Sequence, residues 1–254
     1  MRRTLILFAA GCTLLTSCFV KEDRSVCPCW LNVDLTNVDE ESVTITGWKD
    51  GKLFQETMEE YPDIYETTVP RGEIYVSTIG PTEDIFSGTA LTIPEGEQAD
   101  SLYAHSAKLN TSFESVTDHV TLHKQFATVH LVMQVPDGMD IYPYDLSITG
   151  DTGGWDIRDL SGAQGSFLYS PQRIGANEYE FRVPRQRDSS LKIEMLSSGT
   201  KVDEVALGEI IAQSGFDWTA EDLADITLDI RFKESQVLVK ISGWDKTIIL
   251  DVVI

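Results

Sequence analysis

The side chains best suited to covalent chemistry lie near the start of the chain. All four cysteines, Cys12, Cys18, Cys27 and Cys29, fall within the first 29 residues. A thiolate can act as a nucleophile, ligate a metal or form a disulfide, and its surroundings decide which of these it does. The residues around each cysteine therefore indicate its chemistry.

Cys18 ends a segment typical of a secretory signal peptide. Residues 1–3 form a short basic start, and Thr4–Leu15 is an apolar stretch too short to span a bilayer. Leu15-Thr16-Ser17-Cys18 resembles a bacterial lipobox, in which the cysteine sulfur accepts a diacylglyceryl group and the freed amine is then acylated. Each buried CH₂ adds roughly 0.8 kcal/mol to membrane binding, so several chains anchor stably. We predict cleavage after residue 17 and lipidation of Cys18; the alternative is that Cys12 and Cys18 are only small apolar residues of a leader.

A short charged segment, Lys21-Glu22-Asp23, follows closely after Cys18. It resembles the tag that marks lipoproteins of Bacteroidetes for surface export, although a solvated linker has the same composition. The position directly after the lipidation site favours the tag. We therefore expect a protein on the outer face of the outer membrane, held by the diacylglycerol and N-acyl chains of Cys18 and by no other cofactor.

Cys27 and Cys29 would remain as the thiols of the mature chain. On an extended strand, residues i and i+2 point the same way, with Cα atoms about 6.5–7 Å apart. That spacing lies at the outer limit of the roughly 4.4–6.8 Å usual for a disulfide, and Pro28 either tightens or prevents the closure. The sequence therefore leaves two alternatives, a disulfide between Cys27 and Cys29 or a pair of free thiols. Two cysteines without further ligands do not indicate a metal site.

The sequence lacks the motifs of known catalytic sites. Gly-x-Ser-x-Gly, His-Glu-x-x-His and phosphate-binding glycine loops do not occur. His119 and His123 have the spacing of a metal site on a helix, but the surrounding period of two places His123 and His130 on outer or rim positions of strands. Asp151–Asp156 lacks the spacing and terminal Glu of a calcium loop, so we expect a turn there. The sequence therefore predicts neither a metal site nor an enzyme, although any two of its 41 carboxylates could meet in space.

The charge of the chain excludes several kinds of partner. The 254 residues carry 20 basic and 41 acidic side chains, a formal charge of −21, and loss of residues 1–17 removes two arginines and no acid, which leaves −23. Such a chain repels nucleic acid and anionic lipid, so the acyl chains must supply the membrane affinity. Hydrophobic residues make up 42% of the chain, which argues against disorder.

The hydrophobic pattern beyond Trp30 has a period of two, typical of strands with one buried face. Many short segments of this kind, separated by turn residues, predict an all-β protein of antiparallel β-sandwiches, and the length suits two of them. One helix is expected, at Thr219–Ala224, with Asp217 or Thr219 as its N-cap. The predicted units are a signal peptide (1–17), a lipidated tether (18–29), an N-terminal sandwich (30–117) and a C-terminal sandwich (118–254). The clearest predicted strands are 31–36, 43–48, 64–69, 73–79, 127–135, 145–149, 179–183, 191–196, 226–232, 236–241 and 247–254.

Six segments that occur in one order carry a family resemblance. They are Cys18 with Asp23–Leu31, Val69–Val76, Leu122–Val129, Asp222-Leu223, Asp229–Phe232 and Ile241–Trp244. Together they resemble the fimbrial anchor subunits of Bacteroidales, relatives of the major and minor fimbrium anchors, over nearly the whole mature chain. Each segment alone is ordinary β-sandwich sequence, so the specificity lies in the series.

The resemblance implies two transthyretin-like, Greek-key β-sandwich domains in tandem. It further implies a lipoprotein that holds a pilus to the outer membrane, with the pilin of the fimbrial shaft as its partner. In related pilins the first strand is removed and the groove accepts the last strand of the next subunit. An anchor is expected to keep its first strand, so that growth stops there.

The last strand is the candidate for coupling to another subunit. Ile248, Leu250, Val252 and Ile254 form one apolar face at strand spacing. A donated strand gains a ladder of backbone hydrogen bonds and a row of side-chain pockets. However, Ile249 and Val253 make the second face apolar too, as in a central strand, which slightly favours the alternative that this strand completes its own sheet.

A surface adhesin or glycan-binding lipoprotein on the same scaffold is the alternative function, because a fold does not determine function. Aromatic platforms could bind sugars, and packing at the rims of the sandwiches is the favoured alternative for them. The tryptophans concerned are Trp30, Trp48, Trp155, Trp218 and Trp244.

Overall fold

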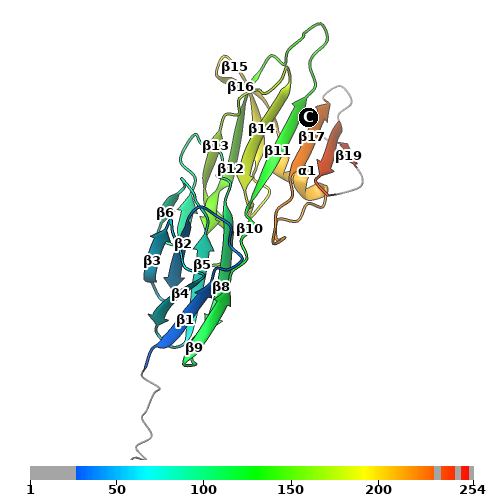
Figure 1. The fold of residues 1–254 in the computed structure, drawn as a ribbon. Coiled ribbons are helices and arrows are strands. Elements are labelled where there is room, and N and C mark those ends of the chain that lie inside the picture. The colour runs from blue at the N-terminus through cyan, green and yellow to red at the C-terminus, as the bar shows by residue number, and fades with distance from the viewer. Residues whose placement is uncertain (1–26, 232–235, 244–246, 252–254) are drawn as a thin grey trace, which may run out of the picture.

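The computed structural model describes residues 27–231, 236–243 and 247–251, which fold into two β-sandwiches placed end to end (Figure 1). The all-β sandwich prediction is confirmed: the described residues are mostly strand and include one helix. No helix in the described part of the chain is long and apolar enough to cross a membrane.

The N-terminal sandwich consists of a three-stranded and a five-stranded sheet. Their strand orders are β4-β1-β9 and β10-β8-β5-β2-β3. The bounds are β1 (Cys29–Asp34), β2 (Val43–Trp48), β3 (Lys52–Met58), β4 (Ile64–Val69), β5 (Glu73–Ile79), β8 (Tyr103–Asn110), β9 (Ser115–His119) and β10 (His123–Lys124). Strand β1 is central in its sheet, because it pairs antiparallel with β4 on one side and parallel with β9 on the other.

The C-terminal sandwich consists of a five-stranded and a six-stranded sheet. Their orders are β14-β11-β17-β18-β19 and β16-β15-β12-β7-β6, with β13 also paired to β12. The bounds are β6 (Ile85–Ser87), β7 (Ala90–Thr92), β11 (Phe126–Met133), β12 (Asp145–Asp156), β13 (Ser161–Tyr169), β14 (Glu178–Pro184), β15 (Lys192–Ser197), β16 (Thr200–Val205), α1 (Leu207–Gln213), β17 (Ile226–Arg231), β18 (Gln236–Ile241) and β19 (Ile248–Asp251).

The hairpin of β6 and β7 connects the two sandwiches, which the sequence analysis did not predict. The hairpin β6–β7 precedes the boundary expected at residues 117 and 118, yet β7 pairs with β12 of the C-terminal sandwich. The turn after β12 lies against the N-terminal sandwich, where the Ser106 hydroxyl donates to the carbonyl oxygen of Arg158. Trp48 and Ile79, from the N-terminal sheets, belong to the same buried cluster as Trp155. The two sandwiches therefore share a packed junction.

The helix lies at a different place from the one predicted. Leu207, Ile210 and Ile211 form a buried stripe at helical spacing in α1, whereas this seven-residue pattern is short enough to resemble the end of a strand. At Thr219, the predicted helix start, the Asp217 carboxylate accepts hydrogen bonds from the backbone N–H at 2.8 Å and the hydroxyl at 2.6 Å. These bonds stabilise a turn there, and the helix prediction is wrong.

Asp151–Asp156 is also not the turn that we expected, because it lies inside the long strand β12. Its glycines serve the sheet: a Cβ on Gly154, which has a φ of +152°, would lie 2.0 Å from the carbonyl oxygen of Leu91 in β7. The register of β12 against β13 also shifts twice over Gly150–Trp155. Glycine here allows a bulged strand and a close neighbour.

Candidate functional site

The entry of the chain into β1 is the first candidate site. Cys18 and the tag Lys21, Glu22 and Asp23 lie outside the described residues. Cys27 and Cys29 are free thiols in the structure, Cys27 exposed and Cys29 buried, so the disulfide alternative is not the one it contains. Burial raises the pKa of the Cys29 thiol, which keeps it protonated and inert.

Arg71 fastens this entry to two turns. Its Nε donates to the carbonyl oxygen of Cys27 at 2.6 Å, and its Nη1 donates to that of Ser112 at 2.5 Å. The carbonyl oxygen of Arg71 accepts a hydrogen bond from the Lys49 ammonium at 2.9 Å. Since Arg71 follows β4 and Ser112 follows β8, one guanidinium holds the segment before β1 to the ends of neighbouring strands.

Strand β1 is sealed into the N-terminal core. The side chains of Cys29, Leu31 and Val33 are fully buried and face the same cluster. The strand is paired over six residues with β4 and over five with β9, so both of its edges are occupied. Removing or exchanging this strand would open the core along its whole length.

Whereas β1 is central in its sheet, the last described strand, β19, lies at the edge of the described sheet. It pairs antiparallel with β18, with Ile248 opposite Val239 and Leu250 opposite Val237. The favoured alternative, that this segment joins its own sheet, is what the structure shows for Ile248–Asp251; Val252 and Ile254 lie outside the described residues. Among the described residues β19 has one neighbour, β18, and Ile249 is 60% exposed, so β19 does not have the central position that two apolar faces suggested.

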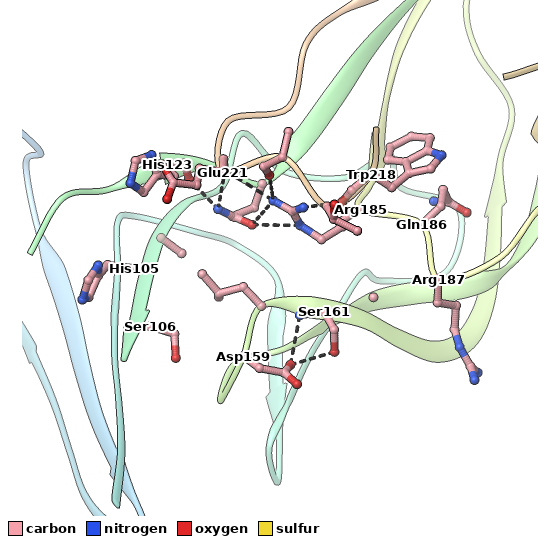
Figure 2. Close-up of a pocket in the computed structure, with 16 residues that line it drawn as sticks. His105, Ser106, His123, Asp159, Ser161, Arg185, Gln186, Arg187, Trp218 and Glu221 are labelled. Carbon is pink, nitrogen blue, oxygen red and sulfur yellow. Dashed lines mark hydrogen bonds between the residues drawn. The ribbon is translucent and has the colours of Figure 1, made fainter. Parts of the chain in front are cut away.

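A cleft of about 650 Å³ lies at the junction of the two sandwiches (Figure 2). Its walls come from β8, β10, the turn before β13, the segment after β14 and the loop at 218–221. In Figure 2, Arg185 and Trp218 line one wall and Asp159 and Ser161 the other. The cleft is therefore built by segments far apart in the sequence.

Arg185 holds the 218–221 loop in place. Its guanidinium donates to the side-chain oxygen of Gln125 at 2.9 and 3.1 Å, to the carbonyl oxygen of Ala220 at 2.8 Å, and to that of Trp218. Gln125 is itself buried, and its carbonyl oxygen accepts a hydrogen bond from the Trp155 indole at 2.8 Å. Burial lowers the pKa of Arg185, although a guanidinium stays charged.

Ion pairs hold β10 and the start of β11 to the segment before β17. The ring of His123 lies 3.0 Å from one carboxylate oxygen of Asp222, and the backbone N–H of Lys124 donates to the other at 2.7 Å. The hydrogen bond from His123 lowers the pKa of Asp222. The Lys124 ammonium pairs with Asp225 at 2.5 Å, and hydrogen bonds from Lys124 and Thr128 outweigh burial and lower the pKa of Asp225. The side chains of Asp222 and Asp225 therefore hold neighbouring segments together.

The cleft does not contain the arrangement of a nucleophilic hydrolase. The Ser161 hydroxyl donates to Asp159 at 2.7 Å, and the Ser106 hydroxyl to a carbonyl. His105 pairs with Asp118 at 3.1 Å. Within the described ranges, no group of three or more His, Cys, Asp or Glu residues is placed to hold a metal ion. The cleft offers hydroxyl, amide and aromatic groups for binding.

The tryptophans divide between core and surface. Trp48 and Trp155 are buried, Trp218 is partly buried in the cleft, and Trp30 is exposed at the start of β1. Trp244 lies outside the described residues. Packing in the core thus accounts for two of the five tryptophans.

The sequence analysis did not identify Gln125 and Arg185 as site residues, because their roles arise from contacts between distant segments.

Comparison with solved structures identifies the fold. A scan against protein-family models finds no match, and a search of curated proteins finds no relative. The fimbrial anchor protein Mfa2 from Porphyromonas gingivalis superimposes with a TM-score of 0.57 at 12% identity, over 86% of this chain and 98% of that one. The chain has the fold of this anchor.

Two further structures share the same fold. A protein of Bacteroides thetaiotaomicron, proposed to bind polysaccharide, has a TM-score of 0.60 at 14% identity over 89% of this chain and 98% of its own. A proposed adhesin of Bacteroides ovatus has a TM-score of 0.53 at 12% identity, over 88% and 96%. The resemblance seen in the sequence is therefore confirmed as a resemblance of fold.

Proposed function

We propose that this protein is a non-enzymatic lipoprotein of the cell surface that anchors fimbriae to the outer membrane and ends their assembly. The observation that carries the proposal is the position of β1. This strand starts 11 residues after Cys18 and is central in its sheet. The fold shared with Mfa2 supports it.

A sealed first strand suits a subunit that terminates a chain of strand exchange. Exchange requires a groove that an incoming strand can fill. Here the groove is filled by the protein's own Leu31 and Val33, and both edges of β1 are paired. No further subunit can be added at this end, while the retained strand connects directly to the lipidated tether.

The same arrangement suits a molecule under tension. Tension on Cys18 acts along β1, where two ladders of backbone hydrogen bonds and the grip of Arg71 on Cys27 resist it together. The other sandwich carries β19, whose second edge is unpaired among the described residues and whose Ile249 side chain is exposed. We assign β19 and the residues after it to the coupling with the shaft pilin.

The test is a photo-crosslink from β19 in cells that carry fimbriae. A photoreactive amino acid at Ile249 of the full-length lipoprotein is expected to capture a pilin, and the same amino acid at Ile174, which is 59% exposed, serves as the control. Cys18→Ala is expected to release protein and fimbriae into the medium. The proposal would be refuted if cells that carry Cys18→Ala kept their fimbriae at the surface and no pilin were captured at Ile249.

The junction cleft favours one second function, a glycan-binding adhesin. Trp218 supplies an aromatic face, and Ser161 and Gln186 supply polar groups, in a cleft of about 650 Å³. Sugars bind to such combinations of rings and polar groups. Recovery of polysaccharide instead of pilin from the same cells, lost in Trp218→Ala, would favour this function.

A further inference from the structure

Two large aromatic side chains are exposed at the end of the N-terminal sandwich where β1 begins. Trp30 is 56% and Phe113 63% exposed, more than any other aromatic residue in the described part of the chain. The backbone N–H of Trp30 donates to the carbonyl oxygen of Glu114 at 2.8 Å, which brings the start of β1 beside the turn that carries Phe113. Single exposed apolar residues are common on protein surfaces, whereas these two lie on adjacent segments.

Four chain segments meet at this end of the sandwich. Register places Cys29 opposite Val69 and Glu73 opposite Asn110, so the turns after β4 and β8 lie beside the start of β1. The Lys49 ammonium reaches the carbonyl of Arg71, which adds the turn after β2. We call this surface, residues 27–30, 49–52, 70–73 and 110–115, the aromatic end.

The aromatic end is electrically neutral on a strongly acidic protein. Its three basic residues balance its three acidic ones, whereas the mature chain carries −23. The basic residues are Lys49, Lys52 and Arg71, and the acidic residues are Asp50, Glu73 and Glu114. An anionic surface repels the acidic remainder of the molecule but does not repel the neutral aromatic end. The protein therefore has one preferred face toward such a surface.

The length of the tether places the aromatic end at the bilayer. Eight residues lie between Cys18 and Cys27, so nine Cα-to-Cα steps connect the two. A fully extended chain of that length spans about 30 Å, and a less extended one spans less, so this end stays close to any membrane that holds acyl chains on Cys18. β1 begins at this end, and β19 lies in the other sandwich (Figure 1).

We propose that the aromatic end rests on the membrane, with the rings of Trp30 and Phe113 in the headgroup layer. Tryptophan is favoured at membrane–water interfaces because an apolar ring and a polar N–H can both be satisfied there. The contact rests on the proposed lipid anchor, which supplies the affinity; the two rings fix the orientation. The molecule then stands upright, with β19 turned away from the bilayer and toward a partner.

The experiment measures how close Trp30 lies to acyl chains. The lipoprotein is reconstituted into vesicles of phosphatidylethanolamine and phosphatidylglycerol whose acyl chains are brominated, since bromine quenches tryptophan fluorescence at short range. We expect part of the emission to be quenched and this quenching to be lost in Trp30→Phe. Trp218→Phe, at the junction cleft, is the matched control and should leave the quenching unchanged.

Phe113 is tested in the same way. Phe113→Ser should weaken the quenching of Trp30, because one of the two contacts that orient the protein is gone. Ile174→Ser, at a residue of similar exposure in the other sandwich, should not. Protein that stays bound to the vesicles but shows equal quenching before and after Trp30→Phe would overturn the proposal, because Trp30 would then lie in water.

Failure of the lipid anchor gives a different result. Mass spectrometry of the purified protein shows whether Cys18 carries acyl chains. If it carries none, the anchor proposal fails, and a protein with Cys12→Ser and Cys27→Ser is attached to a maleimide lipid through the thiol of Cys18, because the remaining thiol, Cys29, is buried. Quenching lost in Trp30→Phe then supports the aromatic end as a membrane-facing surface, and quenching that is unchanged overturns it.

Discussion

Replacing Asp84 by asparagine should change how the stability of this protein depends on pH. Asp84 directly precedes β6, in the segment that crosses from the N-terminal to the C-terminal sandwich, and is only 7% exposed. Burial, assisted by the nearby Asp100 carboxylate, raises its pKa to about 7; hydrogen bonds from Asp100 N–H and Thr82 and the charge of Arg182 oppose this only in part. One of its carboxylate oxygens is buried without a hydrogen-bond partner.

Proton linkage determines whether the stability rises or falls with pH. The folded protein holds a proton on Asp84 up to about pH 7, whereas an unfolded chain releases it near pH 3.8. Between these values the folded state binds more protons, so the stability contributed by Asp84 is fully present below pH 3.8 and is lost as the pH rises through 7. From pH 5 to 8 the loss is on the order of 3 kcal/mol at most, since each pH unit below the folded pKa is worth about 1.4 kcal/mol.

Urea unfolding at pH 5, 6, 7 and 8, followed by tryptophan fluorescence, measures this loss. Asparagine stays neutral, so the difference in unfolding free energy between Asp84→Asn and wild type should shift in favour of the variant by up to about 3 kcal/mol from pH 5 to 8. Glu83→Gln, at an exposed neighbour, controls for the loss of net charge. Profiles of Asp84→Asn and wild type that run parallel would refute the reasoning.

Three further predictions test the other sites. Leu31→Ala should destabilise the protein by about 2–5 kcal/mol in urea unfolding, because it leaves a cavity in the sealed core beside β1, whereas Asn32→Ala, on the other face, should cost less than half as much. Arg185→Lys should speed hydrogen exchange over residues 217–222, because an ammonium cannot replace the forked contacts to Gln125 and the loop carbonyls; equal exchange in the variant would contradict that role. Ile249→Lys should change unfolding free energy by less than about 0.5 kcal/mol yet abolish capture of pilin, and normal capture would exclude this face of β19 as the coupling surface.

Local patterns were sufficient for many strands. The predicted bounds of Val43–Trp48, Ile64–Val69 and Glu73–Ile79 are those of β2, β4 and β5, because alternation and flanking turn residues are encoded within a few positions. The clearest predicted strands do not include β8 and β9. In β8 the alternation is weak, because Ala104 is the one buried residue of the strand; the strand pairs with β5 along its length.

The junction needed the folded molecule. Gln125 and Arg185 lie 60 residues apart, and no spacing rule connects a glutamine beside β11 with an arginine after β14. Their contact exists because β11 and β14 are neighbours in one sheet, and Arg185 also donates a hydrogen bond to Ala220 of the 218–221 loop. The buried state of Asp84 has the same origin, since an isolated Thr-Glu-Asp sequence reads as a solvated turn.

By itself, the sequence determined what depends on neighbouring residues: an all-β chain, its acidic charge, and an apolar strand after Trp244. The tertiary structure decided what depends on partners distant in the chain. It placed β1 at the centre of a sheet and β19 at an edge, and it brought Trp30 and Phe113 to one neutral end. The physical reason is that strand pairing is non-local: alternation shows which face of a strand is buried, but only the packed sheets decide which neighbours it has.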